Sequence, residues 1–377
     1  MTITEGLRRP TGARGLHQPP QGDADPEPED RPRRRPPDTD RLGELGVSAV
    51  AAAVGVWTPF HLAGWDAPFG FVVCWFAALV AIYGVTVHQR HGALELRDRL
   101  ATLTIGAGTT VALLPLFLVL WFVIRHGLPV VLSKFPHFPF VRQDLRNFSP
   151  RDPVSRAGMQ QAIIGSVEQV GLATAMTVPV GILTATYLNE VGGRYAACIR
   201  TVADAMTGLP SIIAGLFVYA AWVQPKHEQG FSGFAAAIAL AVVMLPTVIR
   251  TAEEVLRIVS GHLREAALAL GAPEWRVVLR VVIPTARTGL VTAAILGVAR
   301  AVGETAPVLL TAFGSPRTNL NPFRGTQDDL PMRIYLLVRS PSDSNNAAAW
   351  GGALLLLLVI LTLFTLARIL GSGGRRR

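Results

Sequence analysis

One stretch near the C-terminal end decides the structural class of this chain. Residues 349–370 read AWGGALLLLLVILTLFTLARIL, and Arg368 is their only charged side chain. A transmembrane helix needs about 20 mostly apolar residues to cross roughly 30 Å of hydrocarbon. This stretch is long enough to do so, and the sequence therefore predicts an integral membrane protein.

Further apolar stretches of comparable length precede this one. They are residues 45–63, 69–87, 101–124, 162–188, 201–222, 231–249 and 289–313. The composition agrees, since only 16% of the residues are charged, whereas soluble domains carry about 25%. We therefore predict an all-α integral membrane protein with eight spans. An even number puts both termini on one side, and a modest excess of arginine there, including Arg375 to Arg377, favours the cytoplasm.

The basic net charge does not indicate a nucleic-acid partner. The charge is +9, but the basic residues lie between apolar spans, where they fit anionic lipid headgroups and orientation signals. Cys74 and Cys198 have neither metal nor redox spacing, so we expect no metal site. The chain also lacks a Gly-x-x-x-x-Gly-Lys-Ser/Thr phosphate loop. We therefore expect no cofactor and no enzymatic activity in this chain, with any ATP hydrolysis on a separate one.

The N-terminal part of the chain differs from the rest. Residues 1–43 are rich in proline, arginine and acidic residues, and such a segment cannot bury enough surface to offset its ordering entropy. We predict that it forms a disordered cytoplasmic tail, and it has no apolar segment of the kind that a signal peptide requires. Residues 44–98 are predicted to form a transmembrane hairpin and a charged connector.

A short helix is predicted in the polar loop after residue 249. Residues 264–273 read REAALALGAP, and Ala, Leu and Glu are strong helix formers. Gly271 can end the helix in a left-handed conformation, with Pro273 just beyond it. A second helical piece is expected from Pro273 to Ile283, ending at Pro284. The alanine face suits a helix that docks in a groove of a partner protein, and the alternative is a connector that lies on the membrane surface.

Charged residues inside the predicted spans are candidates for function. Arg300 and Glu304 lie near the middle of span 289–313, where a charge costs on the order of 2.5–3.5 kcal/mol. Their i, i+4 spacing would put them on one helix face as an ion pair. The pair could join two helices, or it could line an ion path, where a guanidinium suits an oxyanion. Arg250, at the end of span 231–249, could equally extend to water.

Two carboxylates in the spans are assigned mainly structural roles. Glu168 lies close to the outer end of span 162–188 and can reach the interface. Asp204 opens span 201–222, where a carboxylate suits the positive end of a helix.

The loop carries a resemblance to a known family. Glu265-Ala266-Ala267, Gly271 and then residues 281–284 (VVIP) are similar to the EAA loop of ABC importer permeases, with Val281 and Ile283 as conservative departures. The resemblance implies a type I ABC importer permease (MetI-like) core of six spans over residues 99–372, plus the N-terminal hairpin. It also implies that the coupling loop 250–288 docks on an ATPase through Glu265, Ala266, Ala267 and Gly271.

A second resemblance narrows the family. Residues 299–307 (ARAVGETAP) are similar to the AR-x-x-GETAP run of the PstA-type permeases of phosphate ABC importers. This implies a multi-pass phosphate permease in the bacterial cell membrane, with Arg250, Arg300 and Glu304 in the substrate path or its gate. The implied partners are a second permease (PstC-like), an ATPase dimer (PstB-like) that holds ATP and magnesium, and an external phosphate-binding protein (PstS-like).

Other interpretations remain open. A permease for sulfate or molybdate would share the EAA loop but not the GETAP run. A gradient-driven secondary transporter would need no docking loop and usually shows internal repeats with broken helices, and the sequence shows no such repeat. A membrane scaffold in phosphate signalling is also compatible with the sequence.

Overall fold

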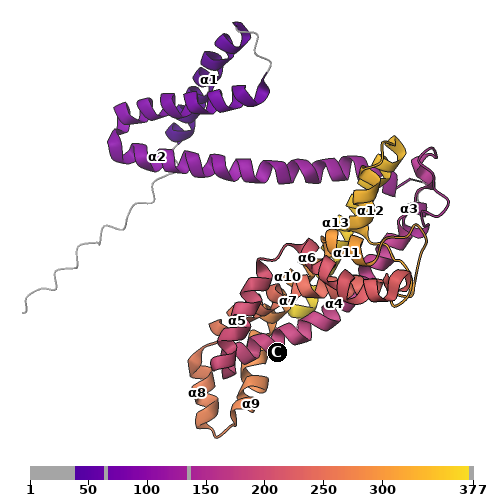
Figure 1. Cartoon of the computed structure of the whole chain (residues 1–377). Helices are drawn as coiled ribbons and strands as arrows, with labels where there is room; N and C mark the ends of the chain where they lie inside the picture. Colours follow the sequence, from indigo (N-terminus) through magenta and orange to yellow (C-terminus); the bar gives the residue numbers. More distant parts are fainter. Residues whose placement is uncertain (1–38, 63–66, 134–136, 373–377) are drawn as a thin grey trace, which may run out of the picture. The chain divides into compact units, whose positions relative to one another are not determined.

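The computed structural model describes residues 39–62, 67–133 and 137–372 (Figure 1). Most of the predicted tail, residues 1–38, and Arg375 to Arg377 lie outside the described residues. Residues 39–43 were predicted to belong to the tail, but they form the first turn of helix α1 (Thr39–Leu62). The chain divides into two compact units, Met1–Val111 and Ala112–Arg377. The boundary between the two units lies inside a helix, after residue 111. The domain boundary predicted between residues 98 and 99 stays a prediction.

Unit 1 is a helical hairpin with a third helical arm. Helix α2 (Pro68–Val131) covers most of the predicted charged connector, because Glu, Leu, Ala and Arg favour helix there. It is interrupted within the connector at Gly92, whose backbone is not helical (φ 84°). A Cβ atom at Gly84 would lie 3.7 Å from Leu96 Cδ1, whereas residues this far apart in a straight helix are about 18 Å apart. The chain therefore reverses its direction at Gly92, as Figure 1 shows.

A buried arginine joins the arms of unit 1. Arg99 is 7% exposed and donates to Glu44 of α1 at 2.8 Å and to Glu95 at 3.0 Å. Trp75 Nε1 donates to the Ala49 carbonyl at 3.0 Å. The polar groups between the arms are thus paired with one another, as burial in a low-dielectric environment requires.

Fewer separate helices could span a membrane than the eight predicted spans. Among the described residues, six helices are long and apolar enough to cross a membrane, and a bent helix pair is a seventh candidate. The predicted eight included residues 69–87 and 101–124 separately, but both fall into α2. Each of the two arms of α2 contains one of these two stretches. The count of eight membrane crossings therefore stays a prediction.

Unit 2 contains the remaining helices. They are α3 (Pro139–Arg142), η1 (Val154–Arg156), α4 (Gln160–Thr186), η2 (Tyr187–Val191), α5 (Arg194–Thr207), α6 (Ser211–Val218), η3 (Tyr219–Val223), η4 (Gln224–Gly230), α7 (Gly233–Ile258), α8 (Gly261–Ala269), α9 (Glu274–Val277), η5 (Val278–Val282), α10 (Ile283–Val302), α11 (Ala306–Thr311), α12 (Leu330–Val338) and α13 (Asp343–Ser372). Among the described residues no strand is present, so the predicted all-α fold is confirmed.

Helix α7 is the centre of unit 2 and packs against α4 and α10. The three helices approach closely because a glycine of α4 and a glycine of α10 both face one valine of α7. A Cβ atom at Gly181 of α4 would lie 2.7 Å from Val248 Cγ1, and one at Gly297 of α10 would lie 2.5 Å from Val248 Cγ2. Small residues that allow close backbone approach are the usual means of helix association in a bilayer.

Two of the predicted spans are broken. Residues 201–222 were expected to form one helix, but α5 and the helix that starts at Ser211 meet at 104°, with Pro210 at the break. Residues 289–313 divide into α10 and α11. The short helices α6 and α11 pack together, and a Cβ atom at Gly215 would lie 2.7 Å from Pro307 Cα.

Pro284 does not end a helix, contrary to the prediction. Helix α10 begins at Ile283 and runs through it, directly after the π-helical turn Val278–Val282. Because proline lacks an N–H and crowds the preceding turn, the wider turn accommodates it at the start of the helix.

The close contact at Val248 predicts the effect of a single methyl group. Gly181→Ala should lower stability by about 1–3 kcal/mol, the usual cost of overpacking, because the valine side chain has few rotamers available. The loss should be smaller in the Gly181→Ala, Val248→Ala double variant than the two single losses added together. Thermal unfolding of the purified protein measures both. Gly171→Ala, in the same helix with no atom within 4 Å, is the control, and an equal effect there would contradict the packing.

Candidate functional site

Arg300 and Glu304 are close to each other, but they do not share a helix face. Helix α10 ends at Val302, so Arg300 lies in its last turn and Glu304 in the irregular segment before α11. The helix ends there because Gly303 is a weak helix former and Pro307 cannot donate to the preceding turn. Arg300 Nε and Glu304 Oε1 are 3.9 Å apart, which is an ion pair rather than a hydrogen bond.

The Arg300 side chain also contacts the central helix. Its Nη1 donates to Thr247 Oγ1 of α7 at 3.3 Å. The side chains of Arg300 and Glu304 remain 36% and 19% exposed within the single chain. Two charged groups thus lie at a helix break next to α7, where they are only partly covered.

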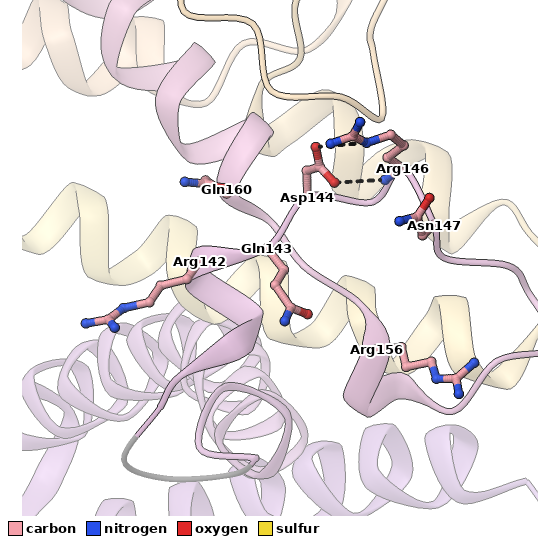
Figure 2. Close-up of a pocket in the computed structure, with 7 residues that line it drawn as sticks. All are labelled: Arg142, Gln143, Asp144, Arg146, Asn147, Arg156 and Gln160. Atoms are coloured by element: carbon pink, nitrogen blue, oxygen red, sulfur yellow. Dashed lines mark hydrogen bonds and ion pairs between the residues drawn. The ribbon is translucent and has the colours of Figure 1, made fainter.

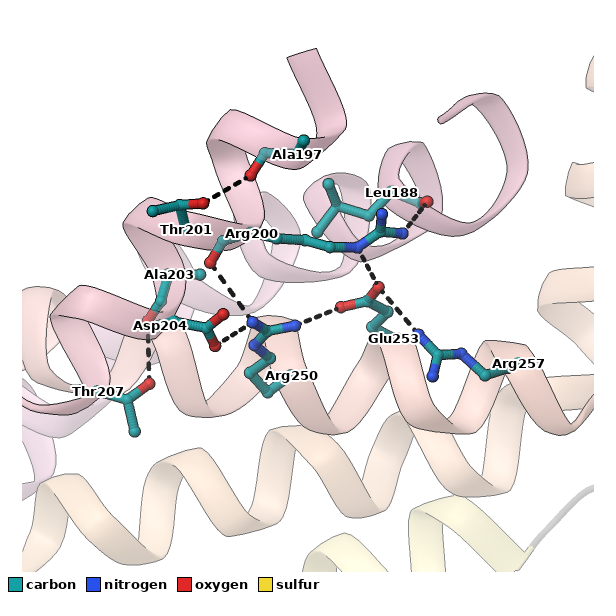
Figure 3. Close-up of polar contacts among 10 residues, drawn as sticks. All are labelled: Leu188, Ala197, Arg200, Thr201, Ala203, Asp204, Thr207, Arg250, Glu253 and Arg257. Carbon is teal, nitrogen blue, oxygen red and sulfur yellow. Dashed lines mark hydrogen bonds and ion pairs between the residues drawn. The ribbon is translucent and has the colours of Figure 1, made fainter. Parts of the chain in front are cut away.

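Arg250 does not extend freely to water but is held by carboxylates. It lies in α7 and pairs with Asp204 of α5 and, at 3.0 Å, with Glu253 (Figure 3). It also donates to the carbonyl oxygen of Arg200 at 3.4 Å. Asp204 was expected at the start of a helix, but α5 begins at Arg194, so the carboxylate lies within the helix and serves as a partner of Arg250.

Glu253 was not identified from the sequence. Its side chain is 2% exposed and accepts from Arg200 Nε at 2.8 Å, Arg250 Nη1 at 3.0 Å and Arg257 Nη2 at 3.4 Å. The predicted span ended at residue 249, whereas α7 runs on to Ile258. The spacing of Glu253, three residues after Arg250 and four before Arg257, is the signal that would have indicated a helical charge cluster.

The predicted docking helix is present as α8. Gly271 has φ 81°, its N–H donates to Leu268 O at 2.8 Å, and the N–H of Ala272 donates to Ala267 O at 3.3 Å. These two bonds form a Schellman motif, so the predicted left-handed stop is confirmed. No residue of α8 is buried, and Glu265 is 79% exposed.

Apolar side chains protrude around α8. Leu268 and Leu270 are 45% and 89% exposed, and Trp275 is 60% exposed. Figure 1 shows α8 and α9 at one end of unit 2, away from α3 and α12. An apolar group of this kind on a protruding helix indicates a surface that binds another protein or a membrane.

The other end of unit 2 has a cavity of about 530 Å³. It is lined by Arg142, Gln143, Asp144, Arg146, Asn147, Arg156 and Gln160 (Figure 2). Arg146 pairs with Asp144 at 3.9 Å, and the guanidinium groups of Arg142 and Arg156 point away from each other. Because its cationic groups do not converge, this cavity is not a compact site for an anion.

A buried polar cluster fixes the segment between α11 and α12. Asp328 accepts from Arg333 Nε at 2.6 Å and from Gln161 Nε2 at 3.4 Å. Gln169 of α4 donates to Gln327 Oε1 and to the Asp328 carbonyl, both at 3.1 Å. Burial raises the pKa of Asp328 to about 6, although Arg333 opposes the shift.

The neighbours of this cluster are also bound. Burial raises the pKa of Asp329, which caps α12 by accepting from the N–H of Met332 at 2.9 Å. Glu168 was expected to reach the interface, but its carboxylate accepts from Gln327 Nε2. The cluster is therefore a structural joint between α4 and the segment before α12.

Comparison with known proteins decides the family. Residues 177–376 match the model of the family of binding-protein-dependent transport system inner membrane components. The chain belongs to this family. It is therefore a multi-pass inner membrane permease component and not itself catalytic, in agreement with the sequence prediction.

The most similar relatives include mycobacterial permeases. The chain is 39% identical over 248 residues to the phosphate transport system permease protein PstA 1 of Mycobacterium tuberculosis (strain CDC 1551 / Oshkosh), which covers 66% of this chain and 79% of the relative. It is 35% identical over 263 residues to PstA of Mycobacterium leprae, covering 70% and 83%. It is 41% identical over 221 residues to PstA of Pasteurella multocida, covering 58% and 77%.

Among solved structures, the chain is similar to a permease chain in an inward-facing structure of the MetNI methionine ABC transporter. The identity is 17% and the TM-score 0.46, over 56% of this chain and 94% of the other.

The raised pKa of Asp328 predicts a pH dependence of stability. Because the folded state binds the proton more tightly than the unfolded state, its stability should fall as the pH rises from 3.8 to about 6. The loss corresponds to roughly 3 kcal/mol. Asp328→Asn keeps an acceptor for Arg333 without the charge, so its stability relative to wild type should grow by most of this amount between pH 4 and pH 7.

Thermal unfolding across this pH range measures the difference. Asp152→Asn, which removes a partly exposed carboxylate near the same end of unit 2, is the control. A difference between wild type and Asp328→Asn that stays constant with pH would contradict the assignment.

Proposed function

We propose that the chain is the transmembrane permease subunit of an ATP-driven phosphate importer. It forms half of the translocation path and couples that path to a separate ATPase through the EAA loop. The observation that carries this proposal is the GETAP run, residues 299–307, at the break between α10 and α11. The mycobacterial and Pasteurella relatives, all phosphate transport system permease proteins, support the same substrate.

The break supplies the chemistry that an oxyanion path requires. Irregular backbone within a membrane is tolerated only where it is buried in protein or lines a water-filled cavity. Arg300 lies at this break, and its planar guanidinium can donate two parallel hydrogen bonds to a phosphate. Glu304, when ionised, can accept a hydrogen bond from the proton that phosphate carries at neutral pH. Arg250, one turn from Thr247 on α7, is proposed to belong to the same path or its gate.

Partners follow from the surfaces left uncovered. We infer a second permease (PstC-like) against the partly exposed Arg300 and Glu304, and an ATPase dimer (PstB-like) that holds ATP and magnesium against α8. An external phosphate-binding protein (PstS-like) delivers the substrate at the opposite end. Glu265, Ala266, Ala267 and Gly271 are the proposed ATPase-coupling residues, because they form an exposed helix and its stop.

The same assignment gives the orientation. If α8 faces the cytoplasm, the chain crosses outward through α10 and α11 and returns through α13, so the C-terminus is cytoplasmic. Counting back from α8 through α7, the bent pair of α5 and α6, α4, the two arms of α2 and α1 gives an even number of crossings. The N-terminus is therefore on the same side.

The rival functions are weighed by different observations. A sulfate or molybdate permease would fit the fold, but its relatives would not share the GETAP run. Broken helices also occur in secondary transporters, so the breaks in α5–α6 and α10–α11 do not discriminate against them. The exposed helix α8 argues against a secondary transporter, because a gradient-driven transporter has no ATPase on which such a helix would dock. A signalling role would be additional to transport.

Uptake by reconstituted vesicles tests the function. The chain, purified with its co-expressed partners and inserted into vesicles, should take up radiolabelled phosphate only with ATP and the binding protein. A hundredfold excess of unlabelled phosphate should abolish the signal, whereas the same excess of sulfate or molybdate should not. ATP-driven uptake of sulfate or molybdate instead would contradict the substrate, and uptake that follows an ion gradient without ATP would contradict the class.

Amide variants test Arg300 and Glu304. Removing one partner of an ion pair strands the other charge, so the double variant Arg300→Gln, Glu304→Gln is the informative one. We expect it to assemble normally and to reduce phosphate uptake at least a hundredfold, because no anion-binding guanidinium remains at the break. Arg317→Gln, an exposed arginine in the loop before α12, is the control. Wild-type uptake by the double variant would show that the pair is only structural.

A further inference from the structure

Arg264, the residue before the coupling motif, ties α8 to two other elements. Its guanidinium donates to the carbonyl oxygens of Leu256 at 3.1 Å and Val259 at 2.9 Å, at the end of α7. It also donates to Glu190 Oε1 at 2.9 Å. A movement of α8 therefore acts directly on the end of α7 and on Glu190.

Glu190 lies in η2, the π-helical turn that continues α4. Its side chain is 11% exposed, so its negative charge is largely removed from solvent. Arg264 is the cation that pairs with it, and Asn189 Nδ2 donates to the same oxygen. The turn ends at Gly192 and Gly193, both with positive φ, and these direct the chain into α5. Glu190 is thus at the corner between α4 and α5, and Arg264 joins this corner to α8.

The same corner is bound to α5 and α7 by Arg200. Its Nη2 donates to the Leu188 carbonyl of η2 at 2.7 Å, and its Nε donates to Glu253 at 2.8 Å. Glu253 then accepts from Arg250. Figure 3 shows the guanidinium groups of Arg200, Arg250 and Arg257 around Glu253.

A series of contacts, continued along the backbone of η2 between Leu188 and Glu190, thus connects α8 to Arg250. They run from Arg264 to Glu190 in η2, from η2 to Arg200, and from Arg200 through Glu253 to Arg250. Every side-chain link in this series is charge-assisted, which makes it shorter and stronger than a neutral hydrogen bond. Contacts of this kind carry coupling when they connect elements that have two arrangements, and the bend between α5 and α6 adjoins this series.

We propose that Glu190 and Glu253 are positioning residues that transmit the movement of α8 to Arg250. This inference rests on the proposed function. Glu253 is the decisive member, because three guanidinium groups surround one buried carboxylate. Without its charge, Arg200, Arg250 and Arg257 repel one another, and Arg250 keeps only Asp204 and the Arg200 carbonyl as partners. Glu190 is the first residue of the series to respond to a movement of α8, since its carboxylate binds Arg264 of α8.

A purely structural role for the two carboxylates makes a different prediction. If they only hold helices together, their loss lowers the stability or the yield of the complex but leaves the ratio of phosphate moved to ATP hydrolysed unchanged. If they transmit movement, the complex assembles and hydrolyses ATP, but hydrolysis no longer responds to the loaded binding protein.

The test uses the complete transporter in vesicles. Glu190→Gln, Glu253→Gln and the double variant are compared with wild type for ATP hydrolysis, with and without phosphate-loaded binding protein, and for phosphate moved per ATP. We expect each variant to assemble and to reduce both the stimulation and the ratio at least fivefold. The double variant should be no worse than the poorer single variant, because both act in one series. Asp152→Asn, which breaks an ion pair at the opposite end of unit 2, should match wild type.

The outcomes separate this inference from the proposed function. Wild type without any phosphate-dependent stimulation would refute the proposed function itself. A stimulated wild type together with Glu190→Gln and Glu253→Gln variants that keep its ratio would overturn the inference alone. Should the Glu253→Gln variant fail to assemble, the Glu190→Gln variant tests the inference. The Glu190 carboxylate has fewer partners than that of Glu253, so its loss disturbs the structure less. Loss of assembly in both would likewise overturn the inference in favour of a structural role.

Discussion

The position of α7 between α4 and α10 is the constraint on which the rest of unit 2 depends. Val248 fits between Gly181 and Gly297 with no room for a further methyl group, so the three helices have one close register. That register puts the neighbouring turns of α7 at the polar groups. Thr247 meets the break after α10, and Arg250 and Glu253 meet α5. The apolar contact and the charged network are therefore parts of one arrangement, since moving α7 would displace both.

The two ends of unit 2 have different chemistry. At one end, α8 has no buried residue, and it is held through Arg264 and a few apolar contacts, including Ala267. At the other end, Gln169, Gln327 and Asp328 hold the segment before α12 against α4 from inside. The first end can move with a partner, whereas the second is fixed within the chain.

Local sequence signals were sufficient for some features and not for others. Most of the apolar spans and the stop at Gly271 depend on residues close together in the chain, and these were predicted. The break after Val302 was not, because residues 289–313 are apolar enough for a helix and the packing of Pro307 on Gly215 involves α6. The Asp328 cluster was missed because Gln161 is more than 160 residues away in the chain. Glu253 was missed because the predicted span ended at residue 249, although two of its three partners are local, and Arg200 is more than 50 residues away. Arg250, Arg300 and Glu304 were found as charged residues in or at the end of predicted spans, and the family resemblance assigned them to the substrate path. The pairing of Arg300 with Glu304 was expected from their spacing, whereas the contacts with α5 and α7 came only from the structure.

The central claim is that α8 docks on an ATPase, since this distinguishes an ATP-driven permease from every other class considered. The most direct measurement is site-specific photo-cross-linking in the assembled complex, with the probe at Ala266, Ala267 or Leu268 and a control probe at Arg142. The account predicts cross-links from the α8 positions to the ATPase subunit and none from Arg142. Cross-links from α8 to lipid alone, with none to a protein partner at any of the three positions, would contradict it.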